Sequence, residues 1–246
     1  MFGTNPVHKQ ELGNGQSLRV QEVFLTIQGE GPLAGTPAVF IRMAGCNLRC
    51  KFCDTEFDSG YEVPISLKSL LAKVMEAQGS CEVLLVVITG GEPLLQNIEP
   101  LCSNLASLGY QVQIETAGTV WVPGLEDMDE LTIVVSPKTR KIHSMIEKWA
   151  TDWKYIIIAG ETDPVDGLPM GTTQRLKLEG LKKPRGVSLI AKPPPHITSN
   201  HIFLQPCDAG KGFEVQSERN RQFAAQLAIR HGYRLSLQQH KILNLP

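Results

Sequence analysis

Short apolar runs rich in β-branched residues alternate along this chain with longer segments in which apolar residues recur every three or four positions. The first pattern predicts buried strands and the second predicts amphipathic helices, so their alternation indicates βα units and a parallel sheet. Six strands are expected, at 37–43, 82–89, 110–116, 130–136, 153–159 and 201–206. Helices are expected at about 66–78, 94–108, 142–150 and 216–232, with Gly232 as the cap that ends the last one.

Two of the predicted strands, EVLLVVIT and ELTIVVS, are apolar along nearly their whole length. This pattern is typical of parallel strands that are buried on both faces. Helices would therefore cover both sides of the sheet or surround a barrel. In either architecture ligands bind at the carboxyl ends of the strands, so the residues that follow each run are the candidates for a functional site.

One segment, 160–196, departs from this alternation because it is rich in proline and in basic residues and has weak periodicity. We interpret it as a surface insertion within a single domain that spans residues 1–246. Its lysines and arginines are more typical of a solvated face than of a binding patch. A regulatory contact with another protein remains an alternative role for it.

The composition favours a small partner. The 246 residues are 42% hydrophobic and 20% charged, with a formal net charge of -1, which provides no basic field for nucleic acid or a membrane surface. The N-terminal residues lack the features of a secretion signal, and no apolar run approaches the ~18 residues of a membrane span. We therefore expect a cytoplasmic location, where thiols stay reduced and clustered cysteines indicate a metal or reactive site.

The stretch GCNLRCKFC places Cys46, Cys50 and Cys53 within eight residues. A structural zinc site needs four ligands, so zinc would require a distant histidine. A cubane iron–sulfur cluster has four irons that each need one outer ligand, so three thiolates leave one iron open for chemistry. The other three cysteines are expected to be buried thiols. They are Cys81, Cys102 and Cys207.

Polar residues and glycines follow several of the predicted strands. TGGEP closes the second strand with Gly90, Gly91 and Glu92, where glycines allow a tight turn and close approach to a ligand. Glu115 lies at the end of the third strand, Ser136 at the end of the fourth, and Lys138 just after it. Taken singly, these residues also suit a strand-to-helix turn, a charged rim and a helix cap. Upstream, QGEG (28–31) suits either a hairpin turn or a cradle for a polar heterocycle.

The spacing and position of the three cysteines resemble the cluster loop of the radical S-adenosylmethionine (SAM) superfamily. Within that superfamily, the motifs QGEG, AVFIRMAGCN, CDTEF, TGGEP, IET, SPK, LQP and LSLQQHKILNLP resemble the 7-carboxy-7-deazaguanine synthase family. This resemblance covers residues 20–158 and 201–246. It implies an α/β fold in the form of a partial TIM-like βα barrel of about six units.

The resemblance also implies the chemistry. Members of the family convert 6-carboxy-5,6,7,8-tetrahydropterin to 7-carboxy-7-deazaguanine, a precursor of queuosine, with loss of ammonia. They use a 4Fe–4S cluster, SAM that is regenerated, and Mg²⁺. By position, Cys46, Cys50 and Cys53 would bind the cluster, and Thr55 would offer an oxygen to Mg²⁺. The SAM contacts would be Phe52, Gly90, Gly91, Glu92, Glu115, Ser136 and Lys138, and the pterin contacts would be Gln28, Glu30, Arg42, His240 and the carboxylate of Pro246.

The resemblance further implies a flavodoxin-like or ferredoxin-like electron donor and a homodimer. Gln239 departs from the family pattern, which has threonine there. Two alternatives remain open: an activase that abstracts hydrogen from a glycine of a partner protein, and a zinc-stabilised binding module without turnover. QGEG, Arg42 and the LSLQQHK end favour the synthase over the activase. The polar LSLQQHK stretch also predicts that the C-terminus is docked, with Pro246 against the rest of the chain.

Overall fold

The structure is a computed structural model that describes residues 5–51, 53, 55–59, 61–172 and 189–246. Its main feature is an eight-stranded sheet with the strand order β10-β9-β8-β7-β6-β5-β3-β2. All neighbouring strands are parallel except β2 and β3, which form an antiparallel hairpin at one edge. The strands are β2 (Val20–Ile27), β3 (Pro37–Met43), β5 (Leu85–Gly90), β6 (Gln111–Thr116), β7 (Thr132–Val135), β8 (Asp152–Ile157), β9 (Ile202–Pro206) and β10 (Arg234–Leu235). A separate pair is formed by β1 (Ser17–Leu18) and β4 (Ile65–Ser66).

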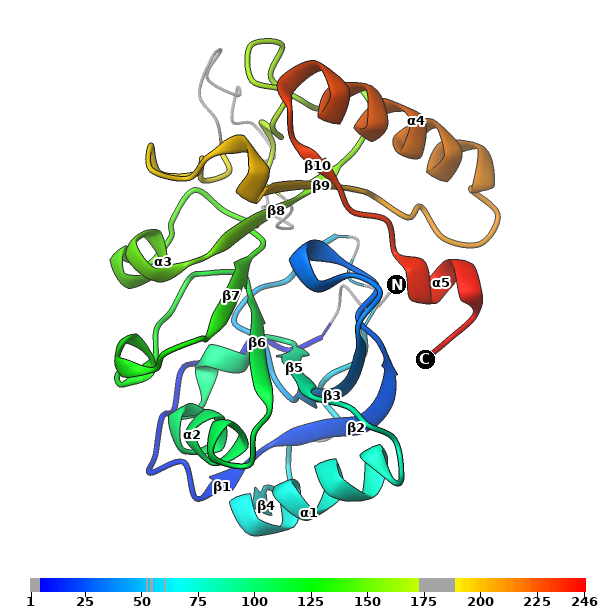
Figure 1. The fold of residues 1–246 in the computed structure, drawn as a ribbon. Helices are drawn as coiled ribbons and strands as arrows, with labels where there is room; N and C mark the ends of the chain where they lie inside the picture. Colours follow the sequence, from blue (N-terminus) through cyan, green and yellow to red (C-terminus); the bar gives the residue numbers. More distant parts are fainter. Residues whose placement is uncertain (1–4, 52, 54, 60, 173–188) are drawn as a thin grey trace.

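Helices lie along the outer side of the curved sheet, and a short C-terminal helix lies near the β2–β3 hairpin (Figure 1). They are α1 (Leu67–Gln78), α2 (Glu99–Ser107), α3 (Ser144–Trp149), α4 (Glu214–His231) and α5 (Gln239–Leu243). Ser66 caps α1 by accepting a hydrogen bond from Ser69 N, and Gly232 ends α4 in the left-handed conformation with φ 69°.

All six predicted strands occur, with boundaries within a few residues of those expected. The helix predicted at 94–108 is divided into a short 3-10 helix at Pro93–Leu95 and α2. β2 and β10 lie outside the six predictions. β2 carries polar residues and is only partly buried, and β10 has two exposed residues, so neither has the continuous apolar run of a strand buried on both faces.

The segment 160–196 is not wholly a surface insertion, which corrects the prediction. Leu168, Ile190 and Ala191 are buried in the main core, and Tyr155 Oη donates to the carbonyl of Ala191 at 2.9 Å. The described flanks of the segment therefore belong to the core. The low apolar content of the segment concealed these three positions in the sequence. The remainder, 173–188, lies outside the described residues.

The QGEG motif lies in the connection between β2 and β3. Gln28 N donates to Thr36 O and Gly35 N donates to Gln28 O, both at 2.7 Å, so this motif does close a hairpin. The C-terminal segment docks onto it, because Gln239 N donates to Gly29 O at 3.1 Å and Thr26 Oγ1 donates to the terminal oxygen of Pro246 at 3.2 Å. The prediction of a docked C-terminus is confirmed.

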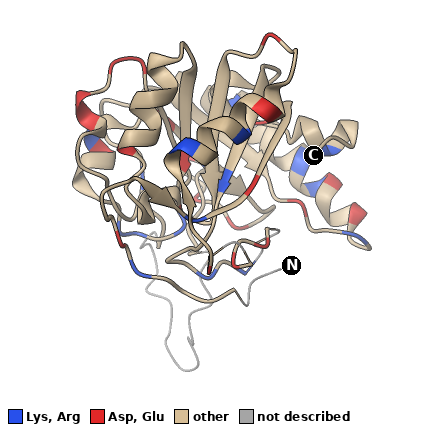
Figure 2. Cartoon of the chain, turned by 90° about the horizontal axis from the view of Figure 1, so that it is seen from below, with Lys and Arg blue, Asp and Glu red and all other residues tan. Residues whose placement is uncertain are grey.

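Acidic and basic residues are interspersed over the helices and loops seen in Figure 2, as the net charge of -1 suggests. Among the helices that the structure describes, none has both the length and the apolar character that a membrane span requires.

Candidate active site

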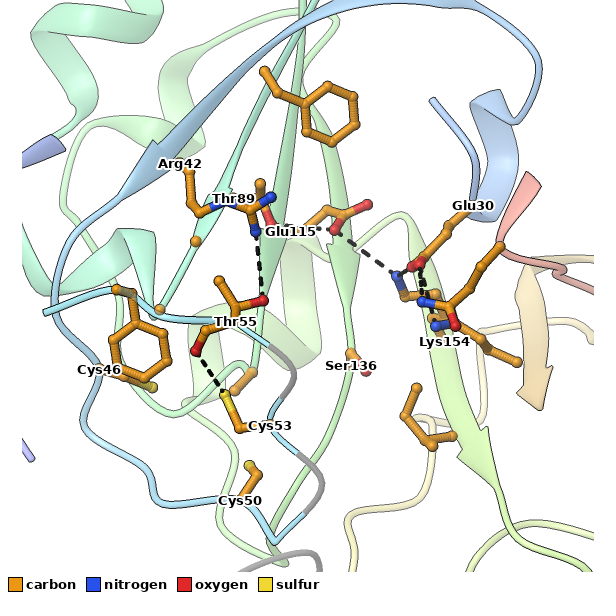
Figure 3. A pocket seen from close by; sticks show the side chains of 18 of the residues that line it. Glu30, Arg42, Cys46, Cys50, Cys53, Thr55, Thr89, Glu115, Ser136 and Lys154 are labelled. Atoms are coloured by element: carbon orange, nitrogen blue, oxygen red, sulfur yellow. Dashed lines mark hydrogen bonds and ion pairs between the residues drawn. The ribbon is translucent and has the colours of Figure 1, made fainter. Parts of the chain in front are cut away.

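A cavity of about 410 Å³ opens at the carboxyl ends of the parallel strands and extends between β2, β3 and β8. Most of the side chains singled out from the sequence line it, although they come from separate parts of the chain (Figure 3). The predicted residues that line it are Gln28, Glu30, Arg42, Cys46, Cys50, Cys53, Thr55, Gly90, Gly91, Glu115, Ser136, Lys138, His240 and Pro246. Glu92 does not line it, and Phe52 lies outside the described residues.

The cysteine loop begins directly after β3. Leu48 N donates to Cys46 Sγ at 3.4 Å, and Cys53 Sγ lies 3.4 Å from the carbonyl oxygen of Thr55. Cys46 is buried, whereas Cys50 and Cys53 are half-buried. Burial raises the pKa of the Cys46 thiol far above its ordinary value, and the nearby Glu92 carboxylate raises it further.

The N-terminal segment supports this loop from outside. His8 N donates to Cys46 O at 2.8 Å, and His8 Nε2 lies 2.8 Å from Asp58 Oδ1. The His8 ring also stacks on Tyr61 with the ring centroids 3.6 Å apart. The loop is therefore held at both its start and its end by one segment that lies far outside the motif.

The three thiols suit an iron–sulfur cubane better than a single ion. Their side chains lie around one corner of the cavity in Figure 3. Within the described part of the chain, no three His, Cys, Asp or Glu side chains are close enough together to hold one metal ion. Three thiolates on one loop match a cluster whose irons each take one outer ligand. A structural zinc would need four ligands around one point, and the described residues contain no such group.

The GGEP turn packs directly against the start of the cysteine loop. A Cβ on Gly90 would lie 2.3 Å from Met43 O, and a Cβ on Gly91 would lie 1.9 Å from Gly45 O. Glu92 N donates to Gly45 O at 2.9 Å, which fixes the contact. The sequence suggested that these glycines allow close approach to a ligand. The structure shows that the neighbouring backbone already requires them.

Glu92 is fully buried behind the cavity wall. Its carboxylate accepts hydrogen bonds from Thr116 Oγ1 at 2.7 Å, Ala117 N at 2.8 Å and Leu94 N at 3.1 Å. Burial raises the pKa of Glu92 in spite of these donors. Its carboxylate therefore ties the GGEP turn to the end of β6, and its predicted contact with SAM stays a prediction.

Ser136 and Lys138 form one unit at the end of β7. Lys138 Nζ donates to the carbonyl oxygen of Ser136 at 2.8 Å and to its hydroxyl. Burial lowers the pKa of Lys138, and the ammonium of Lys154 lowers it further, against the opposing effect of Cys50. The two predicted residues thus lie together on the cavity wall beside the cysteine corner.

Glu30 and Glu115 lie on either side of a buried lysine that the sequence interpretation missed. Lys154 Nζ, on β8, forms an ion pair with Glu30 Oε2 and lies 3.8 Å from Glu115 Oε2. Gln28 Nε2 donates to Glu115 Oε1 at 3.1 Å, and Thr89 Oγ1 donates to Oε2 at 3.2 Å. Glu30 and Glu115, which belong to different motifs, therefore share the ammonium group of Lys154.

Glu30 also accepts hydrogen bonds from two glutamines, Gln238 at 2.9 Å and Gln205 at 3.2 Å. Burial raises the pKa of Glu30, but the Lys154 ammonium, the hydrogen bond from Gln238 and the charge of His240 outweigh it, so the net pKa lies below the ordinary value. Like Lys154, Gln205 lies within a strand and was not among the predicted site residues. A lone polar residue in an otherwise apolar strand was the available signal.

Arg42 occupies the opposite side of the cavity. Its Nε lies 2.5 Å from Glu22 Oε1, its Nη1 donates to Thr55 Oγ1 at 3.5 Å, and its guanidinium lies over the Phe24 ring at 5.5 Å from the centroid. Phe24 in turn stacks on Phe40. The structure thus brings Arg42 and Thr55 together beside an aromatic wall.

The C-terminal residues close the cavity near the hairpin. A Cβ on Gly29 would lie 2.2 Å from His240 Nδ1, so glycine is required for α5 to dock here. Gln239, the departure from the family pattern, makes its contact with the hairpin through its backbone N–H to Gly29 O. A backbone contact of this kind tolerates a change of side chain.

The remaining cysteines lie elsewhere. Cys102 is buried as predicted and burial raises the pKa of its thiol, but Cys81 is exposed and Cys207 is half-buried, so the prediction of three buried thiols was wrong for two of them. Cys81 follows the end of α1, where the chain is exposed before β5, and Cys207 lies at the cavity edge after β9.

The comparisons with known proteins agree with this geometry. Residues 40–138 match the Radical SAM superfamily. The chain is 44% identical over its full length to the full length of a 7-carboxy-7-deazaguanine synthase from Rhodospirillum rubrum, and 35% identical to one from Rickettsia prowazekii, of which it covers 96%. Its structure is similar to the crystal structure of QueE from Escherichia coli, with a TM-score of 0.60, 25% identity, and coverage of 90% of this chain and 94% of that one.

Proposed function

This chain belongs to the 7-carboxy-7-deazaguanine synthase family of the radical SAM superfamily, and we propose that it converts 6-carboxy-5,6,7,8-tetrahydropterin to 7-carboxy-7-deazaguanine with loss of ammonia. The observation that carries the proposal is the placement of three thiols and the QGEG, Arg42 and C-terminal residues around one cavity. This combination joins the cluster motif of the superfamily to the motifs that distinguish the synthase. The product would be a precursor in queuosine biosynthesis.

Cys46, Cys50 and Cys53 would hold the 4Fe–4S cluster, whose fourth iron stays open for SAM. With both bound, the site supplies the one-electron chemistry that removes a hydrogen atom at C6 of the pterin. Ser136, Lys138 and Glu115 lie on the wall between the cysteine corner and β8, which is the position expected for a SAM subsite. The backbone of Gly90 and Gly91 forms the adjoining edge.

The pterin would lie between the aromatic wall and the hairpin. Glu30, kept ionised by Lys154, is suited to accept hydrogen bonds from N–H groups of the pyrimidine ring. Arg42 is suited to pair with the substrate carboxylate through two parallel hydrogen bonds. His240 and the Pro246 carboxylate lie at the same end of the cavity as Gln28. The side chains of Phe24, Phe40 and Ile156 would exclude water from the face of the ring.

Several finer features belong to the same proposal. Thr55 Oγ1 is suited to Mg²⁺, which takes oxygen ligands and keeps some of its waters. The open, curved sheet would be a partial TIM-like barrel within a single domain, completed on one side by the hairpin and α5. A homodimer, a flavodoxin-like or ferredoxin-like electron donor and a cytoplasmic location follow from the family and stay predictions.

The activase alternative shares the cluster loop and the GGEP turn. It needs a site that admits a polypeptide, whereas here α5 and the hairpin pack together at the cavity and place His240 beside Gly29. A carboxylate held by a cation and two amides suits a polar heterocycle better than a peptide backbone. The synthase is therefore the better match.

The test is an anaerobic incubation of cluster-loaded protein with SAM, a reductant, Mg²⁺ and 6-carboxytetrahydropterin, followed by mass spectrometry. Ring-contracted product without stoichiometric consumption of SAM is expected. Cys50→Ala should abolish product, while Cys81→Ala, at an exposed site outside the cavity, should not change it. SAM cleavage without the deazaguanine product would overturn the pterin assignment and point to a protein substrate.

A further inference from the structure

Lys154 is an unusual residue for the middle of a parallel sheet. It lies on β8 between the fully buried Trp153 and Tyr155, and only 5% of its own surface is exposed. Burying an ammonium is costly unless charged and polar partners surround it. The partners found here are Glu30 and Glu115, which come from the β2–β3 hairpin and the end of β6.

These residues form a closed ring of polar contacts together with Gln28. Lys154 contacts Glu30, Glu30 N donates to Gln28 Oε1 at 3.0 Å, Gln28 Nε2 donates to Glu115 Oε1, and Glu115 Oε2 lies 3.8 Å from Lys154. Figure 3 shows the Lys154 side chain next to those of Glu30 and Glu115, with dashed lines that mark the contacts. Three of these four contacts join side chains, and the fourth joins the Gln28 side chain to the backbone of Glu30.

The ring joins the two halves of the cavity. Glu115 lies on the side of Thr89, Ser136 and the cysteine corner, whereas Gln28 and Glu30 lie beside Gln238 and the C-terminal segment. Under the proposed function, these halves are the SAM subsite and the pterin subsite. A ligand that orders one half of the ring also orders the other half, because the same ammonium and the same amide serve both.

Resting on the proposed function, we propose that Lys154 is a positioning residue that couples the binding of SAM to the binding of the pterin substrate. Lys154 contacts both carboxylates and holds them in place toward their ligands, so each ligand finds its subsite partly ordered once the other is bound. Because coupling between two sites is reciprocal, SAM should tighten the pterin by the same factor by which the pterin tightens SAM.

The charge of Lys154 affects the protonation of Glu30, and this effect distinguishes a role for its charge from a role in packing alone. Glu30 faces Lys154 from β8, His240 from α5 and Lys138 from the end of β7, while Glu115 is the neighbouring carboxylate. Lys154 forms an ion pair with Glu30. Without Lys154, burial would dominate and Glu30 would take up a proton at higher pH than in the native protein.

The experiment uses cluster-loaded protein held anaerobically without reductant, so that both ligands bind and no turnover occurs. The dissociation constant of SAM is measured by calorimetry with and without saturating 6-carboxytetrahydropterin. In the native protein the pterin should tighten SAM binding at least about fivefold, the lower end of common coupling strengths. In Lys154→Met this ratio should fall to about one.

Two further measurements distinguish coupling from damage to the fold. The pterin affinity of Lys154→Met should weaken as the pH is lowered from 8 to 6, whereas that of the native protein should change little. Lys192→Met removes a lysine that pairs with Asp166 outside the cavity, so it should keep the native ratio. Circular dichroism verifies folding, and Lys154→Gln, which is neutral but still donates a hydrogen bond, replaces the methionine variant if that variant does not fold.

Each outcome decides a different question. A native protein that binds both ligands without coupling overturns the inference, whatever the variants do. A folded Lys154 variant that keeps the native ratio overturns it as well. A native protein that binds SAM but not the pterin contradicts the proposed function instead, so the two failures are distinguishable.

Discussion

At Gly91 the backbone of the GGEP turn passes so close to the cysteine loop that a Cβ would lie 1.9 Å from Gly45 O and 3.1 Å from Cys46 Cβ. Gly91→Ala should therefore push the turn away from the loop and lower the free energy of unfolding by about 1–3 kcal/mol, the usual cost of overpacking. It should also lower the iron content after reconstitution. Thermal unfolding and iron analysis measure the two effects.

Gly171→Ala is the matched control, because a Cβ there meets nothing within 4 Å. Equal melting temperatures and iron contents for the two alanine variants would contradict the packing that the structure shows at Gly91.

Thr55 combines a hydroxyl at the cavity wall with a backbone carbonyl that accepts hydrogen bonds from Asn5 Nδ2 at 3.0 Å and from the Cys53 thiol. Thr55→Ala removes the hydroxyl and the γ-methyl group but leaves the backbone carbonyl, so the cysteine loop should keep its backbone contacts and its iron. We expect product formation to fall or to lose its response to Mg²⁺, measured as turnover against Mg²⁺ concentration alongside the iron content. Thr198→Ala, at an exposed position away from the cavity, should behave like the native protein. An unchanged Mg²⁺ response in Thr55→Ala would remove this hydroxyl from the metal site.

At the scale of single residues, the sequence predicted the cavity residues that belong to motifs, including Arg42 in β3 and Glu115 in β6, and missed isolated polar residues within strands. Cys46, Gly90 and Ser136 come directly after apolar runs, where ligands bind in parallel sheets. Lys154 and Gln205 interrupt apolar runs instead, and their partners come from distant segments. The pairing of Lys154 with Glu30, 124 residues apart, depends on how the hairpin folds over the sheet and could not be obtained from spacing.

Between elements, one polar contact ties the loop before α4 to the C-terminal helix. Asp208 Oδ2 lies 3.3 Å from Lys241 Nζ, and Asp208 Oδ1 accepts hydrogen bonds from Gly210 N and Ser217 Oγ. The hydrogen bond from Gly210 N, followed by the Lys241 charge, lowers the pKa of Asp208 below its ordinary value of 3.8. Both residues lie at the cavity edge, so this contact helps to hold α5 against the site.

A lowered carboxyl pKa has a defined consequence for stability. The contribution of Asp208 is fully present above its unfolded-state pKa of 3.8 and is lost as the pH falls through the lower folded-state pKa. Asp208→Asn should therefore be less stable than the native protein at pH 5–8, by less than about 1 kcal/mol because the pair is partly exposed. The difference should shrink as the pH falls below about 4. Urea unfolding of both proteins across this range measures it, and a difference that grows on acidification would show that the pKa is not lowered.

The strand predictions succeeded where burial on both faces leaves a continuous apolar run. β3, Pro37–Met43, occurs with the predicted bounds. β2 failed to stand out because it lies at the sheet edge and is only partly buried. That omission matters because β2 and its hairpin supply Phe24, Gln28 and Glu30 to the cavity lining.

For the whole molecule, the sequence correctly indicated an α/β protein with a largely parallel sheet. It did not show that the sheet stays open with eight strands or that the flanks of 160–196 enter the core. Composition averages over a segment, and a few buried residues among many prolines and charges do not change the average. The flanks are joined to distant elements by single hydrogen bonds, such as Tyr233 Oη to Asp166 O at 3.0 Å and Ala191 N to Thr139 O at 2.9 Å.

The two views of this segment make opposite predictions for substitutions in it. A surface insertion tolerates truncation of its apolar residues, whereas a core segment does not. Leu168 and Ile190 are 2% and 3% exposed, so Leu168→Ala and Ile190→Ala should each lower the free energy of unfolding by about 2–4 kcal/mol through lost contacts and the cavity that remains. Val165→Ala is the control in the same segment, because Val165 is 84% exposed and its truncation should change the stability by less than about 0.5 kcal/mol. Chemical denaturation of the three variants measures the differences. Similar stability for all three would mean that the flanks pack loosely and that the chain tolerates this segment as an insertion, while the expected contrast would make 160–172 and 189–196 part of the structural unit that holds β8 and α4 beside the cavity.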